Sequence, residues 1–154
     1  MDLLERILNP ACTAIDVQAS SRKRALEAIS EIAAATAASL DADAVYDALQ
    51  ARERLGSTGL GEGVAIPHCR FSCDEMTAVF VRLAEPVEYD APDQQAVDLL
   101  FALIVPEEET SLHLTVLAQL SRAFSEPTNL SLLREAHTAE ELRATLMRDV
   151  PQEG

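Results

Sequence analysis

The sequence predicts one α/β domain, residues 1–154, built as a sandwich in which helices flank a small mixed β-sheet. Segments with apolar residues at three- and four-residue spacing are interspersed with short apolar runs, a pattern typical of helices and strands. Aromatic residues make up only 4% of the chain and Trp is absent, so the core must consist mainly of Ala, Leu, Val and Ile. We expect the core to span about residues 3–147 and residues 148–154 to form a loose tail.

The composition narrows the classes of function. The formal net charge is −14, and so acidic a surface repels nucleic-acid phosphates and anionic lipids. We therefore expect no nucleic-acid ligand and no membrane insertion. The N-terminus includes acidic residues and lacks the apolar segment of a signal peptide. The three cysteines, Cys12, Cys69 and Cys73, do not have the spacing of a disulfide framework, so we expect a cytoplasmic protein with reduced thiols.

The N-terminal half is expected to hold a strand and two helices. Residues 11–17 alternate loosely between apolar and polar and predict a short strand. Ser20 and Ser21 can cap the helix that follows, and Asp41 can cap a second one that Gly56 is expected to terminate. The apolar stripe of the first helix comprises Leu26, Ile29, Ala33, Ala37 and Leu40. The inward-facing positions of the second helix are Val45, Ala48 and Leu49.

Two longer strands are expected in the second half of the chain. Residues 77–84 alternate enough to form a half-buried strand. Residues 97–105 are apolar almost throughout, which suits a central strand covered on both faces. Pro106 and an acidic run after it are expected to end this strand.

Three helices are expected to follow. Thr110 is the predicted cap of a long helix. Its apolar stripe includes Val116, Leu117, Leu120 and Phe124. Shorter helices are predicted near 127–135 and 138–148, the latter with a capping box formed by Thr138 and Glu141.

Residues 61–70 read GEGVAIPHCR and place a histidine at a restrained position. The glycines permit backbone angles that other residues resist, and residues 64–66 are interpreted as a short buried strand. Pro67 fixes its own φ and donates no amide hydrogen bond. His68 is therefore expected where this strand ends, held by a stiff neighbour.

Three side chains, Arg52, His68 and His113, could together bind an anion. Arg52 lies three residues after Leu49 on the apolar stripe of its helix, where a structural salt bridge is the commoner role. His113 falls in a first helical turn, which favours an anion, although an exposed histidine is the commoner case there. His68 can serve as a nucleophile or base, but a lone loop histidine is more often a bystander. Two histidines and an arginine at element ends favour a phosphate ligand, whereas His137 is interpreted as a surface residue.

Two other chemistries use the same residues. Cys69 and Cys73 with His68 and His113 could bind zinc, but the spacing of the cysteines and the lack of a second pair make this pattern weak. Cys69 could also pair with His68 in nucleophilic catalysis, although neighbouring side chains in a strand point to opposite sides. The sequence contains no GxSxG elbow, Walker loop or dinucleotide-binding glycine motif.

Two longer stretches resemble one known family. Residues 52–68, RERLGSTGLGEGVAIPH, resemble the phosphoacceptor region of enzyme IIA proteins of the phosphoenolpyruvate phosphotransferase system. The resemblance continues through LLFALIVPEEETSLHLTVLAQLSRAF, residues 99–124, and covers the chain from about residue 3 to about residue 147. The nitrogen-regulatory, or PtsN, branch is the most similar, together with the mannitol and fructose domains of the same fold. The family fold is an α/β sandwich with a mixed sheet flanked by helices.

The resemblance implies a phosphocarrier of the transferase type. His68 matches the histidine that accepts a phosphoryl group from an HPr-type histidine carrier. His113 matches the second histidine, which hydrogen-bonds that group, and Arg52 the arginine that neutralises its charge. Ser57 lies in the family's GST segment and is expected to contribute a hydroxyl or an amide to phosphate binding. Neither a metal nor an organic cofactor is implied.

The chain departs from the family pattern at two positions near the acceptor. Cys69 stands where a glycine is more usual, and its side chain could narrow the approach of the carrier or add redox sensitivity without abolishing phosphorylation. Glu62 stands where an asparagine is frequent, and its negative charge could weaken phosphoryl binding by repulsion.

The resemblance leaves three functions open. The first is a phosphocarrier whose phosphorylation state regulates other proteins, and the family suggests potassium transport systems and sensor kinases as targets. The second is the IIA component of a mannitol- or fructose-type uptake system, which the lack of a fused IIB or IIC segment disfavours. The third is a binding module that no longer accepts phosphate, and the joint presence of Arg52, His68 and His113 counts against it.

Overall fold

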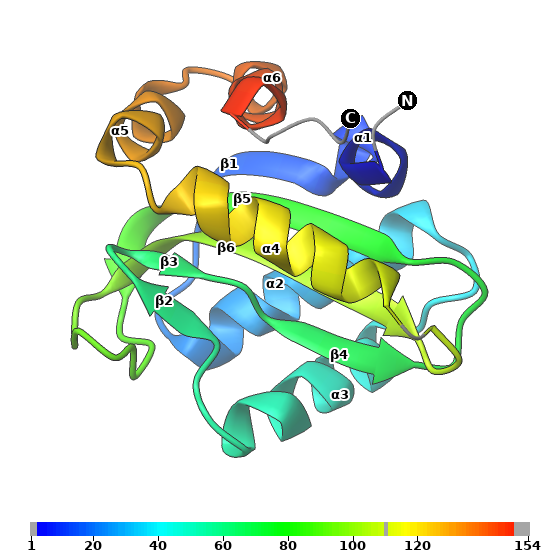
Figure 1. Cartoon of the computed structure of the whole chain (residues 1–154). Helices are drawn as coiled ribbons and strands as arrows, with labels where there is room; N and C mark the ends of the chain where they lie inside the picture. Colours follow the sequence, from blue (N-terminus) through cyan, green and yellow to red (C-terminus); the bar gives the residue numbers. More distant parts are fainter. Residues whose placement is uncertain (1–2, 110, 150–154) are drawn as a thin grey trace.

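A six-stranded mixed β-sheet forms the centre of the molecule, and helices cover both of its faces (Figure 1). The computed structural model describes residues 3–109 and 111–149. The strands are β1 (Thr13–Val17), β2 (Gly59–Gly61), β3 (Val64–Ala65), β4 (His68–Phe71), β5 (Thr77–Val87) and β6 (Val97–Pro106). Their order is β1-β5-β6-β3-β2, with β4 pairing with β6. The predicted fold class, a mixed sheet flanked by helices, is therefore confirmed.

The apolar run at 97–105 forms the central strand, as predicted. β6 pairs antiparallel with β5, where Phe80 lies opposite Phe101, and its other edge pairs in parallel with β3 and then β4. Residues 99–104 of β6 have no exposed surface. A strand segment bonded on both edges and covered on both faces has no position for a polar side chain, which explains why residues 99–105 are all apolar.

The helices form layers on either side of this sheet. They are α1 (Leu3–Ile7), α2 (Arg22–Thr36), α3 (Ala42–Arg54), α4 (Leu112–Phe124), α5 (Pro127–Glu135) and α6 (Ala139–Asp149), with a short 3₁₀ helix η1 (Pro10–Cys12). In Figure 1, α4 lies in front of β5 and β6, and α2 lies behind them. Among the described helices, none combines the length and apolar character that a membrane span requires.

Three of the predicted helix caps are present. The Ser21 hydroxyl accepts a hydrogen bond from the N–H of Arg24 at 3.2 Å, and Asp41 accepts one from that of Ala44 at 3.0 Å. At α6 the Thr138 hydroxyl accepts from the N–H of Glu141 at 3.0 Å. The reciprocal bond of this capping box differs slightly, because the Glu141 carboxylate accepts from the N–H of residue 137 instead of 138.

Several boundaries differ from those predicted. Residues 11–12 belong to η1, because Asn9 caps the turn that begins at Pro10. α2 ends at Thr36, so the last two residues of the predicted stripe lie beyond the helix. The predicted cap Thr110 lies outside the described residues, and Ser111 occupies the N-cap position of α4. α6 ends one residue later than predicted, and residues 150–154 of the expected tail are also outside the described part.

Candidate functional site

His68 begins a strand instead of ending one, which corrects the expectation for this stretch. β3 and β4 pair in succession with the same edge of β6, so that Ala65 lies opposite Leu100 and His68 opposite Leu103. Between the two strands, the carbonyl of Pro67 accepts a hydrogen bond from the N–H of Leu103 at 2.9 Å. Because Pro67 has a fixed φ and is bonded to the central strand, the backbone of His68 is held in a defined position.

The imidazole of His68 is half-buried and has one nitrogen engaged. Nδ1 lies 2.8 Å from the carbonyl oxygen of Ile66. A carbonyl oxygen can only accept, so Nδ1 carries the proton that forms this bond. In the neutral ring Nε2 then holds the lone pair, and it is the nitrogen that can act as a nucleophile.

The surroundings of His68 favour the neutral ring. Burial lowers the pKa of His68, and the electrostatic effects of Arg52 and His113 lower it further, against the opposing effects of the Ile66 hydrogen bond and Glu53. The pKa of His68 is therefore below the ordinary value of 6.5. Arg52 from α3 and His113 from α4 both shift the pKa of this imidazole, so both lie within electrostatic range of His68.

The lowered pKa of His68 predicts a measurable pH dependence. As the pH falls through 6.5, a histidine of the unfolded chain takes up a proton before His68 of the folded chain does. The free energy of unfolding therefore decreases as the pH falls from about 6.5 through the lower folded-state pKa. An NMR titration of the ring protons is expected to give His68 a midpoint below 6.5. A midpoint at or above that value would contradict the described environment.

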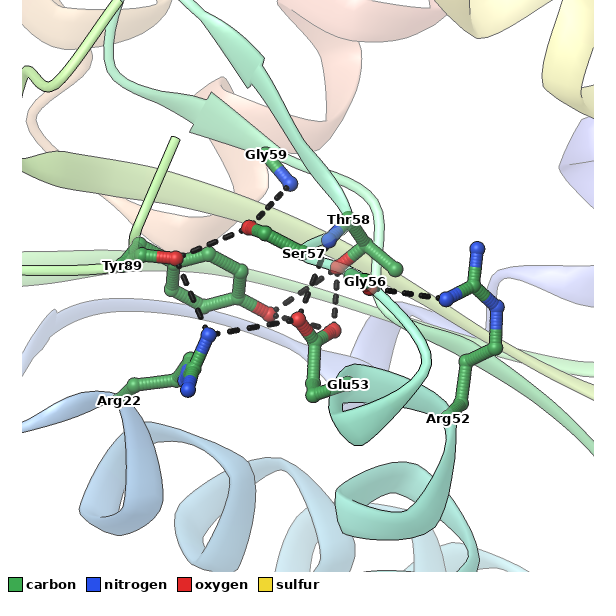
Figure 2. A network of polar contacts seen from close by, with 8 residues as sticks. All are labelled: Arg22, Arg52, Glu53, Gly56, Ser57, Thr58, Gly59 and Tyr89. Atoms are coloured by element: carbon green, nitrogen blue, oxygen red, sulfur yellow. Dashed lines mark hydrogen bonds and ion pairs between the residues drawn. The ribbon is translucent and has the colours of Figure 1, made fainter. Parts of the chain in front are cut away.

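Arg52 lies in the last turn of α3, with its guanidinium extended toward the loop that follows (Figure 2). Nη1 donates a hydrogen bond to the carbonyl of Gly56 at 2.9 Å. The structural salt bridge that its pattern favoured is absent, since Arg52 forms no ion pair with any described residue. No carboxylate of a described residue therefore occupies the guanidinium, and its further N–H groups can bind an anion.

His113 is largely buried, unlike the exposed histidine that is common in a first helical turn. Its side chain is 15% exposed, and Nδ1 lies 3.4 Å from Oε2 of Glu109. The same oxygen is 3.4 Å from the N–H of His113, while Ser111 makes no side-chain cap. Desolvation raises the pKa of Glu109, but hydrogen bonds from His113 and from the N–H of Leu112 outweigh it, so the pKa is lowered. An ionised Glu109 can therefore orient the ring, with Nε2 on the opposite side.

The hydroxyl of Ser57 is engaged with the backbone. It donates to the carbonyl of Tyr89 at 2.9 Å and accepts from the N–H of Gly59 at 3.1 Å (Figure 2). Gly59 is needed at this point, because a Cβ there would lie 2.9 Å from the Cβ of Ala91. The Ser57 hydroxyl therefore holds the segment after α3 against the segment that contains Tyr89.

A buried carboxylate next to Arg52 was not found from the sequence. The side chain of Glu53 is 2% exposed, and Glu53 is the one buried charged residue in the described part of the chain. Its carboxylate accepts hydrogen bonds from the N–H and hydroxyl of Thr58 and from the hydroxyl of Tyr89 (Figure 2). The four-residue steps from Val45 through Leu49 to Glu53 were a signal that this side chain faces inward.

The two rival chemistries of this region gain no support. Cys69 is buried, and burial, followed by the effect of Cys73, raises its pKa to about 12. A nucleophilic cysteine needs a thiolate, which this environment disfavours near neutral pH. Within the described ranges, no three His, Cys, Asp or Glu side chains gather as a metal site would require.

Glu62 lies in the turn between β2 and β3. Its φ is +59°, between Gly61 at +98° and Gly63 at +79°, which explains the spaced glycines of this stretch. Its N–H donates to the carboxylate of Asp93 at 2.8 Å, and its side chain is exposed. Glu62 is not among the charged groups that shift the pKa of His68.

Comparisons with known proteins agree on one family. The family described as "Phosphoenolpyruvate-dependent sugar phosphotransferase system, EIIA 2" matches residues 6–148. The nitrogen regulatory protein of Escherichia coli K12 is 45% identical over 141 residues, which are 90% of this chain and 86% of that protein. The crystal structure of nitrogen regulatory protein IIA-Ntr from Neisseria meningitidis has a TM-score of 0.86 at 41% identity, covering 94% of this chain and 99% of that one. The crystal structure of IIA mannitol from Escherichia coli, at 21% identity, has a TM-score of 0.70 over 86% and 95% of the two chains and shares the fold.

Proposed function

The chain belongs to the EIIA 2 family of the phosphoenolpyruvate-dependent sugar phosphotransferase system, and we propose that it is a phosphocarrier that accepts one phosphoryl group on Nε2 of His68. The observation that carries the proposal is the hydrogen bond between Nδ1 of His68 and the carbonyl of Ile66, which leaves the lone pair on Nε2. The lowered pKa of His68 keeps that lone pair unprotonated near neutral pH. A fixed, neutral imidazole is suited to nucleophilic attack on phosphorus.

The proposed donor is a phosphohistidine of an HPr-type carrier. Nε2 of His68 attacks the phosphorus in line with the donor nitrogen, the old P–N bond breaks, and its electron pair returns to the donor imidazole. As the new P–N bond forms, positive charge develops on the ring of His68. The carbonyl of Ile66 disperses this charge by accepting the hydrogen bond from Nδ1–H. One P–N bond forms at His68 as one breaks at the donor imidazole, so the transfer needs no further reactant.

Arg52 and His113 are the proposed partners of the phosphoryl oxygens. Both have an electrostatic effect on the imidazole of His68, so a group bound to Nε2 would lie within electrostatic range of both side chains. Arg52 supplies planar N–H donors, and Glu109 orients the ring of His113, so that Nε2 of His113 is the nitrogen left available to the phosphoryl group. Because the hydroxyl of Ser57 is engaged with the backbone, its proposed contribution to phosphate binding is the amide.

The proposed role is regulatory and cytoplasmic. The name "nitrogen regulatory protein" of the 45% identical relative supports regulation over sugar uptake. We propose that the phosphorylated and free forms are distinguished by other proteins, such as potassium transport systems or sensor kinases. The net charge of −14 favours a basic surface on the partner that binds.

Intact mass spectrometry tests the proposed function. The purified chain is incubated with phosphoenolpyruvate, enzyme I and an HPr-type carrier, with omission of the carrier as the control. We expect one acid-labile phosphoryl group, only when the carrier is present. Rapid discharge to a mannitol- or fructose-type IIB domain would identify a sugar-uptake component instead, and no phosphoryl uptake would contradict the proposal.

A further inference from the structure

We propose that Glu53 is a positioning residue of the phosphoryl site, because its buried carboxylate fixes the segment 56–58 that orients both His68 and Arg52. The proposal rests on the proposed function only in taking His68 as the acceptor. Glu53 lies on α3 directly after Arg52. Its role is to hold neighbouring groups in place, without contact with the phosphoryl group.

One continuous series of hydrogen bonds leads from Glu53 to the acceptor. Oε1 of Glu53 accepts from the N–H of Thr58 at 3.1 Å. The carbonyl of Thr58 accepts from the N–H of Ile66 at 3.0 Å. The carbonyl of Ile66 in turn accepts from Nδ1 of His68 at 2.8 Å. The position of Thr58 therefore sets the position of the Ile66 carbonyl. This carbonyl in turn determines which nitrogen of His68 is protonated.

A second connection leads to the guanidinium. The N–H of Gly56 donates to the backbone carbonyl of Glu53 at 3.1 Å, and the carbonyl of Gly56 accepts from Nη1 of Arg52 at 2.9 Å. Gly56 has a φ of +151°, and it precedes the anchored Thr58 by two residues. A shift of Thr58 would therefore also move the carbonyl that holds Arg52.

The network that surrounds Glu53 explains why a carboxylate suits this position. The hydroxyl of Tyr89 donates to Oε2 at 3.0 Å, and the hydroxyl of Thr58 donates to the same oxygen (Figure 2). Nη1 of Arg22 lies 3.9 Å from Oε1 and donates to the carbonyl of Tyr89 at 3.2 Å. A buried charge is costly unless donors satisfy it, and here a backbone amide and two hydroxyls do so, with the guanidinium of Arg22 as an ion-pair partner. An apolar side chain would leave the N–H of Thr58 without this partner.

Two substitutions separate the hydrogen bond from the charge. Glu53→Leu removes the acceptor of the Thr58 N–H. Glu53→Gln keeps an amide oxygen as that acceptor, and its NH₂ group can donate to the hydroxyls of Thr58 and Tyr89. We expect Glu53→Leu to lower kcat/KM for phosphoryl uptake about 10- to 100-fold and Glu53→Gln to restore most of it. Leu142→Ala, in the buried face of α6 on another part of the sheet, is the control for a general loss of stability.

The ¹⁵N NMR shifts of the His68 ring report its tautomer. If Glu53 contributed only to the stability of the fold, its substitution would leave these shifts unchanged. We expect Glu53→Leu to move the ring away from the Nδ1-protonated tautomer, and Glu53→Gln and Leu142→Ala to keep it. In Glu53→Gln the pKa of His68 is expected to fall, because the carboxylate that raises it is gone. If Glu53→Leu changes neither the tautomer nor the rate beyond the Leu142→Ala control, the proposal is overturned.

A second variant, Tyr89→Phe, allows the same test if the Glu53→Leu protein does not fold. Tyr89→Phe removes one donor to the carboxylate, and it is expected to shift the His68 ring in the same direction by a smaller amount. Unchanged ¹⁵N shifts in Tyr89→Phe would then overturn the positioning role. These NMR measurements use the unphosphorylated protein. A wild-type chain that takes up no phosphoryl group would therefore contradict the proposed function while leaving this test intact.

Discussion

Replacing His68 with alanine is expected to abolish phosphoryl uptake from an HPr-type carrier. The substitution removes Nε2 of His68, the proposed acceptor of the phosphoryl group. Intact mass after incubation with the phosphorylated carrier measures the result directly. The fold should persist, since His68 is half-buried and its side chain makes one hydrogen bond, to Ile66, at a net cost of about 1 kcal/mol.

His137→Ala is the matched control for His68→Ala. His137 is exposed in the connection between α5 and α6, and its removal should leave phosphoryl uptake unchanged. Labelling of His68→Ala at the wild-type level would show that another residue is the acceptor.

The second large effect is expected for Arg52→Gln. Loss of the guanidinium removes the positive charge proposed to neutralise the phosphoryl oxygens, and removal of one such donor typically slows transfer about 100-fold or more. Rates from quenched-flow labelling, compared at equal carrier concentration, measure this loss. Nε2 of His68 remains present in this variant, so slow phosphorylation to completion is still expected.

Arg54→Gln provides the control for Arg52→Gln. Arg54 belongs to the same helical turn and is exposed, so its substitution changes the net charge equally without reaching the site. Equal losses in both variants would indicate a general effect of charge on carrier binding, and a normal rate in Arg52→Gln would contradict the neutralising role.

Much of the fold could be predicted because local signals agree with the tertiary structure. The almost entirely apolar run of β6 indicated a strand buried on both faces, and Ser21, Asp41 and Thr138 marked helix starts through their own side-chain bonds. The short strands β2 and β4 could not be found in the same way. Each has three or four residues, and its strand conformation depends on pairing with residues distant in the sequence.

The candidate site was only partly visible in the sequence. Arg52, His68 and His113 stand at element ends where an anion could bind, and in the structure Arg52 and His113 lie within electrostatic range of His68. Glu109 was interpreted only as part of an acidic run after β6, although it lies one helical turn before His113. Tyr89 lies outside the helices and strands, so nothing local indicated that its hydroxyl would meet the carboxylate of Glu53 from another part of the chain.

The ring nitrogen that carries the phosphoryl group is the most direct test of the proposed function. The chain, labelled with ¹⁵N in its histidines, is phosphorylated by the carrier, and the phosphorus–nitrogen coupling is measured by NMR. We expect this coupling at Nε2 of His68, with Nδ1 still hydrogen-bonded to the carbonyl of Ile66. A coupling at Nδ1 of His68, or at either nitrogen of His113 or His137, would contradict it.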